Sequence, residues 1–289
     1  MIKLIASDMD GTLLNESSLV SDKNKEAILF AQEQGIEFMV ATGRGRMEAY
    51  PVLDRVGLHL PMITVNGAQV YDQSGDILFT ISFEKDAVET IVSILRKHQL
   101  YFELATSQGT YSDSHIRRIQ STTRYIHSNR PYVSPKLAIA MTAAHLEMLN
   151  VQFVDDFSGI LADKHISILK FIVFSMDEDE RLAQAAAEIN LLPDLAVTSS
   201  AKNNIEINHI NAQKGLALKK VAESRGIAME NVMTIGDNFN DISMLEVAGI
   251  SFAMANGPEE VHKHAKFLAK SNAEDGVADA IYQVIKDQL

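Results

Sequence analysis

Short apolar runs alternate with amphipathic stretches in the first part of the chain. Residues 2–7 are mostly apolar and lead into the polar turn D-M-D-G-T, which predicts a buried strand. Ser21 opens an amphipathic stretch that Gly35 closes, which predicts a helix. The apolar run 36–41 predicts a second strand, ending at Thr42-Gly43. Strands that alternate with helices in this way favour a parallel sheet with helices on both faces.

The pattern changes in the middle of the chain and returns near its end. A helical stretch at 84–99 is followed by two short strand-like runs, by a polar and mostly helical region at 113–160, and by a buried strand at 166–175. Two further strand-like runs suggest a hairpin around 201–203. The C-terminal part again alternates, with a helix at 214–225 before a strand at 232–235. The middle therefore predicts an α+β domain inserted into an α/β one.

The predicted fold class is α/β, a Rossmann-like doubly wound parallel sheet with an inserted α+β domain. We expect a discontinuous core of residues 1–83 plus 210–289 and an insertion of residues 84–209. A length of 289 residues suits two domains.

Composition narrows the classes of function. The chain has 26 Lys+Arg against 38 Asp+Glu, a net charge of −12, which disfavours a nucleic-acid partner. It has no Cys, which excludes disulfides, thiolate nucleophiles and Cys-based metal sites, and favours a reducing, cytoplasmic setting. We see no signal peptide and no apolar run long enough for a membrane span. Oligomeric state stays open.

Two carboxylates follow the first predicted strand. Asp8 and Asp10 flank Met9, and Gly11 and Thr12 complete a tight turn at an edge of the sheet where ligands bind in α/β folds. Two carboxylates this close repel each other unless a cation lies between them or one of them holds a proton. Both conditions suit phosphoryl transfer, with one carboxylate as nucleophile and the other as proton donor. The alternative is a solvated turn with incidental acids.

A second polar cluster, G-D-N-F-N-D, follows the strand at 232–235. Asp237, Asn240 and Asp241 offer the hard oxygen ligands that Mg²⁺ prefers. The alternative is an Asx-rich turn that caps the next helix, and capping and metal binding are compatible. The spacing does not match an EF-hand loop.

Two weaker signals involve possible phosphate contacts. Thr42-Gly43-Arg44 ends a strand, where a hydroxyl and free backbone N–H groups can hold phosphate oxygens. Lys214 opens a helix, a position that is usually a solvated face unless other motifs accompany it. The run G-R-G-R is not a dinucleotide fingerprint. His262 and His264 fit no zinc spacing and are expected on a surface helix.

Taken in order, D-M-D-G-T-L, T-G-R, K-G and G-D-N-F-N-D resemble the motifs of the haloacid dehalogenase-like hydrolase superfamily. The chain is most similar to its Cof-type phosphatases, which carry a class II cap of subclass B. Supporting marks are V-N-G-A, I-E-I, M-A-N-G and S-N-A-E-D-G-V-A, at residues 65–68, 205–207, 254–257 and 271–278. The resemblance covers the whole chain and implies a hydrolase with an inserted cap.

The resemblance also implies a role for each motif residue. Asp8 would be the nucleophile that forms an aspartyl-phosphate, and Asp10 the general acid and then the base that activates water. Mg²⁺ would be held by the Asp8 carboxylate, the Asp10 main-chain carbonyl and Asp237, with Asp241 supporting these ligands from behind. The phosphoryl-binding residues would be Thr42, Gly43, Lys214 and Asn240.

Substrate and reaction remain open at this stage. We expect a small phosphorylated metabolite: a sugar phosphate, a flavin or pyridoxal phosphate, or a biosynthetic intermediate such as the ribitylaminouracil phosphate of the riboflavin pathway. Candidate substrate contacts are Asn66, Arg44 and the cap loops 107–109 and 199–203, each of which can equally be an ordinary polar turn. The alternatives to a phosphatase are a sugar phosphomutase and a non-catalytic phosphometabolite-binding regulator. A dehalogenase fits poorly, because that reaction needs no metal and would give no role to the Asp10 and Asp237 carboxylates.

Overall fold

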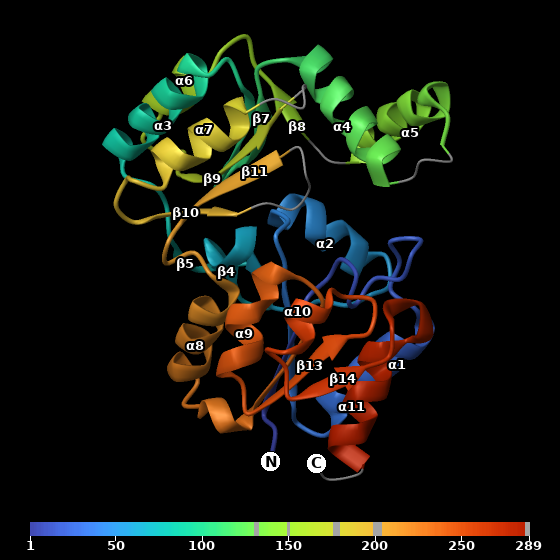
Figure 1. Cartoon of the computed structure of the whole chain (residues 1–289). Coiled ribbons are helices and arrows are strands. Elements are labelled where there is room, and N and C mark those ends of the chain that lie inside the picture. Colours follow the sequence, from blue (N-terminus) through green and yellow to red (C-terminus); the bar gives the residue numbers. More distant parts are fainter. Residues whose placement is uncertain (130–132, 149–150, 176–179, 199–203, 287–289) are drawn as a thin grey trace. The chain divides into compact units, whose positions relative to one another are not determined.

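The computed structural model describes residues 1–129, 133–148, 151–175, 180–198 and 204–286. The chain divides into two compact units, one formed by Met1–Thr80 with Asn211–Leu289 and the other by Ile81–Ile210 (Figure 1). We call the first the core unit and the second the inserted unit, because the second interrupts the first in sequence.

The core unit contains an eight-stranded sheet. In sheet order its strands are β14 (Phe267–Ala269), β13 (Ile250–Met254), β12 (Val232–Gly236), β1 (Leu4–Ser7), β2 (Glu37–Ala41), β3 (Met62–Thr64), β4 (Gln69–Tyr71) and β5 (Ile77–Thr80). The strands from β14 to β3 are parallel, whereas β4 and β5 add an antiparallel edge. The predicted parallel sheet is confirmed, and the turn Val65–Gly67 joins β3 to β4. The short strands β5 and β14 were not predicted.

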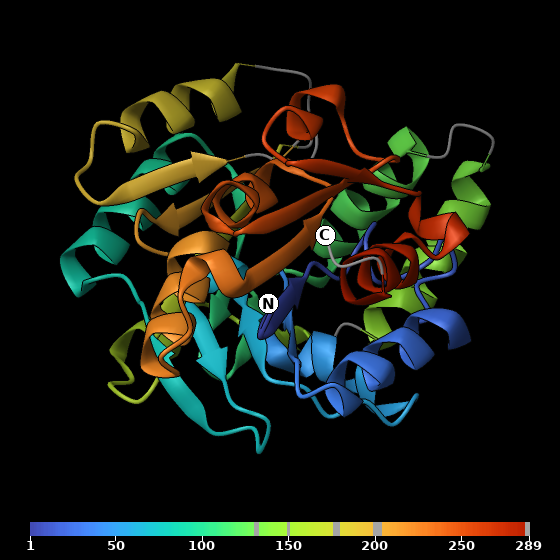
Figure 2. The same cartoon turned by 90° about the horizontal axis from the view of Figure 1, so that it is seen from below.

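Helices cover both faces of this sheet. The core-unit helices are α1 (Asp22–Glu33), α2 (Arg46–Asp54), α8 (Lys214–Ser224), α9 (Ile242–Val247), α10 (Glu259–His262) and α11 (Gly276–Lys286). Helices of the core unit lie on both sides of its sheet (Figure 2). Apolar residues of α1, α2 and α11 pack into one buried cluster, and those of α8 and α9 into another. Ser21 is the predicted N-cap of α1, and its side chain accepts a hydrogen bond from the Asn24 N–H.

The inserted unit has its own six-stranded sheet. In sheet order its strands are β10 (Leu195–Thr198), β11 (Asn204–His209), β9 (Ile168–Phe174), β6 (Tyr101–Thr106), β7 (Gly109–Ser112) and β8 (Val151–Phe153). Its helices are α3 (Lys85–Lys97), α4 (His115–Asn129), α5 (Pro135–Met148), α6 (Ser158–Ala162) and α7 (Arg181–Ile189). All neighbouring strands pair antiparallel except β7 and β8. The unit is therefore α+β, as predicted.

Alternation along the strands of the inserted unit gives its sheet one apolar face. Phe102 and Phe171 are buried on that face, together with apolar residues of α3 and α7. Tyr111 belongs to the same cluster, and Tyr101 is buried as well. The expectation of a helical region at 113–160 was wrong at β8, whose three residues are too few to show a strand pattern.

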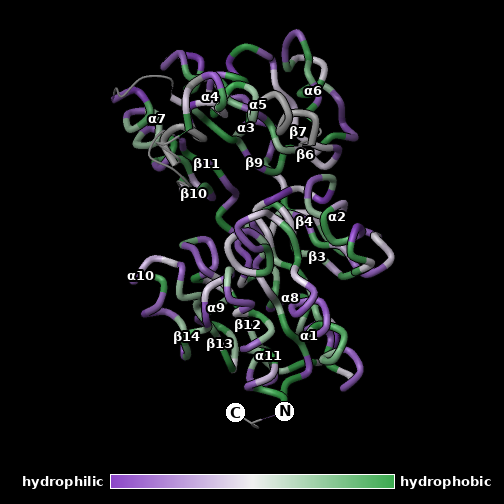
Figure 3. The backbone as a smooth tube through the Cα atoms, turned by 90° about the vertical axis from the view of Figure 1, so that its right-hand side faces the viewer, coloured by the Kyte–Doolittle hydropathy of each residue, from purple (hydrophilic) through white to green (hydrophobic). Residues whose placement is uncertain are grey.

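Hydropathy along the chain agrees with this division into buried and exposed parts. In both units hydrophobic stretches fall on strands and on inward helix faces, and hydrophilic stretches fall mainly on loops (Figure 3). Among the helices of the described residues, none is long and apolar enough to cross a bilayer.

Candidate active site

The site begins at the carboxyl end of β1, a central strand of the core sheet. β1 pairs with β12 on one side and β2 on the other, so the ends of these three strands meet. Its residues Leu4–Ser7 are fully buried, as its apolar sequence predicts. The Asp8 N–H extends the ladder by donating to the Ile235 carbonyl at 2.8 Å. The Asp8 side chain is therefore fixed at the sheet edge and is almost completely buried.

Lys214 lies beside Asp8 and is completely buried. Its Nζ donates to Asp8 Oδ1 at 2.6 Å and to Asp241 Oδ1 at 2.7 Å. A glycine makes this approach possible: a Cβ at Gly215 would lie 2.0 Å from the Ser243 carbonyl oxygen. The start of α8 therefore lies against the start of α9, and the lysine on its first turn points into the core unit. The solvated-face alternative for Lys214 is wrong.

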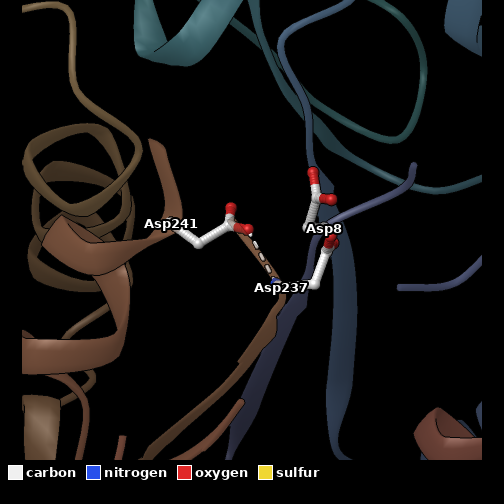
Figure 4. Close-up of side chains that lie close together, drawn as sticks. All are labelled: Asp8, Asp237 and Asp241. Atoms are coloured by element: carbon white, nitrogen blue, oxygen red, sulfur yellow. Dashed lines mark hydrogen bonds between the residues drawn. The ribbon is translucent and has the colours of Figure 1, made fainter. Parts of the chain in front are cut away.

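Three carboxylates meet around this lysine. Oxygens of Asp8, Asp237 and Asp241 lie within 4.8 Å of one another (Figure 4). Asp241 Oδ2 accepts hydrogen bonds from the N–H groups of Asp237 and Asn238, both at 2.9 Å. The 236–241 loop is thus a capping turn and part of an acidic cluster at once. Thr12 Oγ1 donates to Asp237 Oδ1 at 2.6 Å and joins the turn after β1 to this loop.

The charges of this cluster are incompletely balanced. Burial, the neighbouring charge of Asp241 and that of Asp237 raise the pKa of Asp8 well above its usual value, although Lys214 opposes the shift. Burial and the charge of Asp241 raise the pKa of Asp237 to about 6. Burial lowers the pKa of Lys214, but the charges of Asp241 and Asp8 outweigh burial and raise it overall. Three carboxylates facing one ammonium group are a set of hard oxygen donors that could hold a divalent cation.

The loop after β2 forms a second side of the site. Thr42 is buried, and its Oγ1 accepts a hydrogen bond from the Arg44 N–H at 3.1 Å. The Arg44 guanidinium reaches Asp10, with Nε donating to Oδ2 at 2.7 Å and Nη2 donating to Oδ1 at 2.5 Å. Asp10 therefore points its carboxylate at Arg44, and the carboxylate cluster around Lys214 does not include it.

The loop 65–67 lies against the same segment. Asn240 Nδ2 donates to Asn66 Oδ1 at 3.1 Å, and a Cβ at Gly43 would lie 3.0 Å from the same oxygen. Val65 and Asn66 both have positive φ, 49° and 57°. A β-branched residue in this region is strained and is held only where its surroundings fix it, often near functional sites. Gly43, Asn66 and Asn240 are therefore brought together.

Comparison with known proteins identifies the family of this chain. The family model for haloacid dehalogenase-like hydrolases matches residues 5–281. The chain belongs to this family. A curated relative in it is the 5-amino-6-(5-phospho-D-ribitylamino)uracil phosphatase YwtE of Bacillus subtilis, 34% identical over 99% of each chain. Phosphatase YwpJ of the same organism is 32% identical over 96% of this chain and 98% of its own. A solved structure of a haloacid dehalogenase-like hydrolase from B. subtilis matches with a TM-score of 0.87 and 29% identity, over 98% of this chain and all of that one.

Membership in this family confirms two expectations. The resemblance to haloacid dehalogenase-like hydrolases is correct, and the chain is a phosphoric monoester hydrolase. The ten individually named candidates fall in the core unit, in two segments of the chain that the insertion separates: Asp8, Asp10, Thr42, Gly43, Arg44, Asn66, Lys214, Asp237, Asn240 and Asp241. The candidate cap loop 107–109 falls in the inserted unit.

Sequence reasoning missed several contacts of the family site. Thr12 was expected to stabilise its own turn, whereas its partner is Asp237. Asn256 was not singled out, although its Nδ2 donates to the Gly11 carbonyl at 2.8 Å and so supports the Asp8–Thr12 turn. The sequence signal that could have identified Asn256 is the motif M-A-N-G at residues 254–257, in which it lies. The pairing of Arg44 with Asp10 had no sequence signal, because it depends on how two loops meet.

Candidates outside this cluster do not form a further metal site. His262 Nε2 lies 3.1 Å from the Met254 carbonyl, and His264 Nδ1 lies 2.6 Å from Glu246 Oε1. In the part of the chain that the structure describes, the carboxylate group around Lys214 is the metal-ligand cluster found. The turn 107–109 is bound within the inserted unit, where Gln152 Nε2 donates to the Gln108 carbonyl. Residues 199–203 lie outside the described residues.

Proposed function

We propose that this chain is a Mg²⁺-dependent phosphatase that hydrolyses small phosphorylated metabolites through an aspartyl-phosphate on Asp8. The observation that carries the proposal is the buried contact of Lys214 with Asp8 and Asp241, beside Asp237. A surface turn would not bury a lysine with two carboxylates and half-bury a third, because burial of charge is costly unless it is paired and used.

Asp8 is the nucleophile in this proposal. The Lys214 ammonium favours its ionised form, against the effect of burial. A carboxylate oxygen attacks phosphorus, the ester P–O bond breaks, and the leaving oxygen takes its electron pair together with a proton from Asp10. In the second step water attacks the aspartyl-phosphate, Asp10 accepts the water proton, and the bond between phosphorus and Asp8 breaks. Inorganic phosphate leaves and the Asp8 carboxylate is restored.

Donors around the end of β2 would hold the phosphoryl oxygens. Thr42 Oγ1 accepts from the Arg44 N–H, which leaves its own hydrogen to donate. Lys214, Asn240 and backbone N–H groups at Gly43 add positive charge or further donors. Fixed donors of this kind stabilise the charge spread over the transferring phosphoryl group.

The cation site fits the same proposal. Asp241 already accepts three hydrogen bonds from the protein, so Asp8 and Asp237 are the better direct carboxylate ligands, with the Asp10 carbonyl as a further one. When bound, Mg²⁺ neutralises charge on the carboxylates and on the phosphoryl oxygens. We assign chemistry to the core unit and substrate discrimination to the inserted unit.

The test is phosphate release from a panel of phosphometabolites, with Mg²⁺ and with chelator, for wild type and Asp8→Asn. The name of the YwtE relative makes 5-amino-6-(5-phospho-D-ribitylamino)uracil the first substrate to include, followed by pyridoxal, flavin and sugar phosphates. We expect release that needs Mg²⁺ and disappears in Asp8→Asn. Isomerised sugar phosphate without free phosphate would indicate a mutase instead. Binding without turnover would indicate a regulator, and turnover in Asp8→Asn would refute the mechanism.

A further inference from the structure

The contact between Arg44 and Asp10 is more specific than a general charge attraction. Two guanidinium nitrogens, Nε and Nη2, each donate to a different oxygen of the carboxylate, at 2.7 and 2.5 Å. Parallel hydrogen bonds of this kind fix the plane of a carboxylate as well as its position. The Asp10 side chain is about half exposed, 53%, so little other packing would hold its rotamer.

The backbone of Arg44 is fixed by hydrogen bonds at both its N–H and its carbonyl. Its N–H donates to Thr42 Oγ1, and its carbonyl accepts from the Val65 N–H at 2.9 Å. Val65 and the next residue, Asn66, have the left-handed backbone described above, and Asn66 N–H donates to the Thr42 carbonyl at 3.0 Å. The strained loop thus fixes the segment that carries the guanidinium. A strained support is expected where the position of a side chain matters for function.

We propose that Arg44 is a positioning residue that orients the Asp10 carboxylate for hydrolysis of the aspartyl-phosphate. The inference rests on the proposed function and assigns Arg44 to its second step. As held by Arg44, Asp10 accepts hydrogen bonds on both oxygens. Each oxygen keeps a second lone pair, which can take the proton of the attacking water.

The two steps can be separated kinetically with an aryl phosphate. 4-Nitrophenyl phosphate has a good leaving group, so formation of the aspartyl-phosphate depends little on a proton donor. For such a substrate kcat/KM reports the first step, while kcat reports hydrolysis of the intermediate once that step is slow. The amplitude of the initial nitrophenolate burst gives the concentration of active sites. Rates expressed per active site then exclude any misfolded enzyme from the comparison.

We expect Arg44→Gln to lower kcat by about 10–100-fold, the usual cost of a displaced acid–base group. KM should fall in parallel, kcat/KM should stay within about threefold, and a burst near one nitrophenolate per enzyme should appear. The phospho-enzyme should be detectable by mass in acid-quenched samples. Arg44→Lys keeps the positive charge but not the two parallel N–H donors of the guanidinium. Its kcat should therefore lie between those of Arg44→Gln and wild type. Arg55→Gln, on an exposed arginine just after α2, is the matched control and should behave as wild type.

A double-variant comparison completes the test. If Arg44 acts through Asp10, Arg44→Gln should change kcat less than about twofold in an Asp10→Ala background. A fall in kcat/KM without a burst, or independent losses in the double variant, would overturn the proposal and place Arg44 on the substrate. Failure of the phosphatase proposal looks different: wild type would release no phosphate, or Asp8→Asn would remain active.

Discussion

The unbalanced charge of the carboxylate cluster predicts an unusual effect of substituting Asp237. The folded protein raises the pKa of this group from 3.8 to about 6. In the absence of metal the folded state therefore binds more protons than the unfolded state between about pH 4 and pH 6. The contribution of Asp237 to the free energy of unfolding therefore falls as pH rises across that window, and it stays reduced above it.

The size of the effect follows from the shift. About two pKa units at about 1.4 kcal/mol each give about 3 kcal/mol. Asp237 is only half-buried, so water screens part of this, and we expect about 1–3 kcal/mol. Asp237→Asn removes the charge and keeps an oxygen that can accept from Thr12 Oγ1, while its new N–H₂ group can donate to the nearby Asp8 carboxylate. The variant should be more stable than wild type at pH 7.5 without metal, and inactive.

The assay is urea unfolding of both proteins with chelator at pH 4.5 and pH 7.5, followed by the same measurement with Mg²⁺. The advantage of the variant should be small at the lower pH and should disappear or reverse with Mg²⁺, because only wild type gains binding energy from the cation. Glu33→Gln, at an exposed carboxylate on α1, is the control for loss of one negative charge. If Asp237→Asn were less stable than wild type at pH 7.5 with chelator, the electrostatic argument would be refuted.

Three further substitutions test the same site. Lys214→Met should cost about 3–5 kcal/mol in metal-free unfolding and abolish phosphate release, because it leaves the buried Asp8 carboxylate without its cation. Thr12→Val keeps the shape and removes the hydrogen bond to Asp237, so it should cost about 1.5–3 kcal/mol in metal-free denaturant titration. It should also weaken Mg²⁺ binding measured by calorimetry. Gly215→Ala should cost about 1–3 kcal/mol in thermal unfolding and lower kcat, because its Cβ would meet a backbone oxygen at 2.0 Å.

Much of the site could be predicted because strand ends concentrate polar residues in an α/β sheet. Asp8, Thr42 and Asp237 each follow an apolar run, and parallel strands bring such positions to one edge. Position along a strand is a local property that the sequence carries. The same reasoning fails for short strands such as β8, where too few residues are present to show a period.

Partners inside the site could not be predicted, since they depend on how distant loops meet. The sequence alone indicates a surface lysine at position 214. Lys214 is buried because Gly215, which has no side chain, allows α8 to lie close to α9. Asp241 could be a ligand or a cap from its sequence, and only its hydrogen bonds with Lys214 and two backbone N–H groups show how its oxygens are used. The pairing of Arg44 with Asp10 likewise needs both loops in place.

The division of the site between two chain segments has a consequence for its synthesis. Asp8 is translated 206 residues before Lys214. β1 pairs with β12, which is translated later still. At the usual elongation rate this interval lasts about 10–40 s. The inserted unit, whose sheet closes entirely within Ile81–Ile210, can form during that interval. The nascent segment that carries apolar β1 must meanwhile remain without its β12 neighbour, which leaves one side of this strand unpaired and accessible to chaperones throughout the interval.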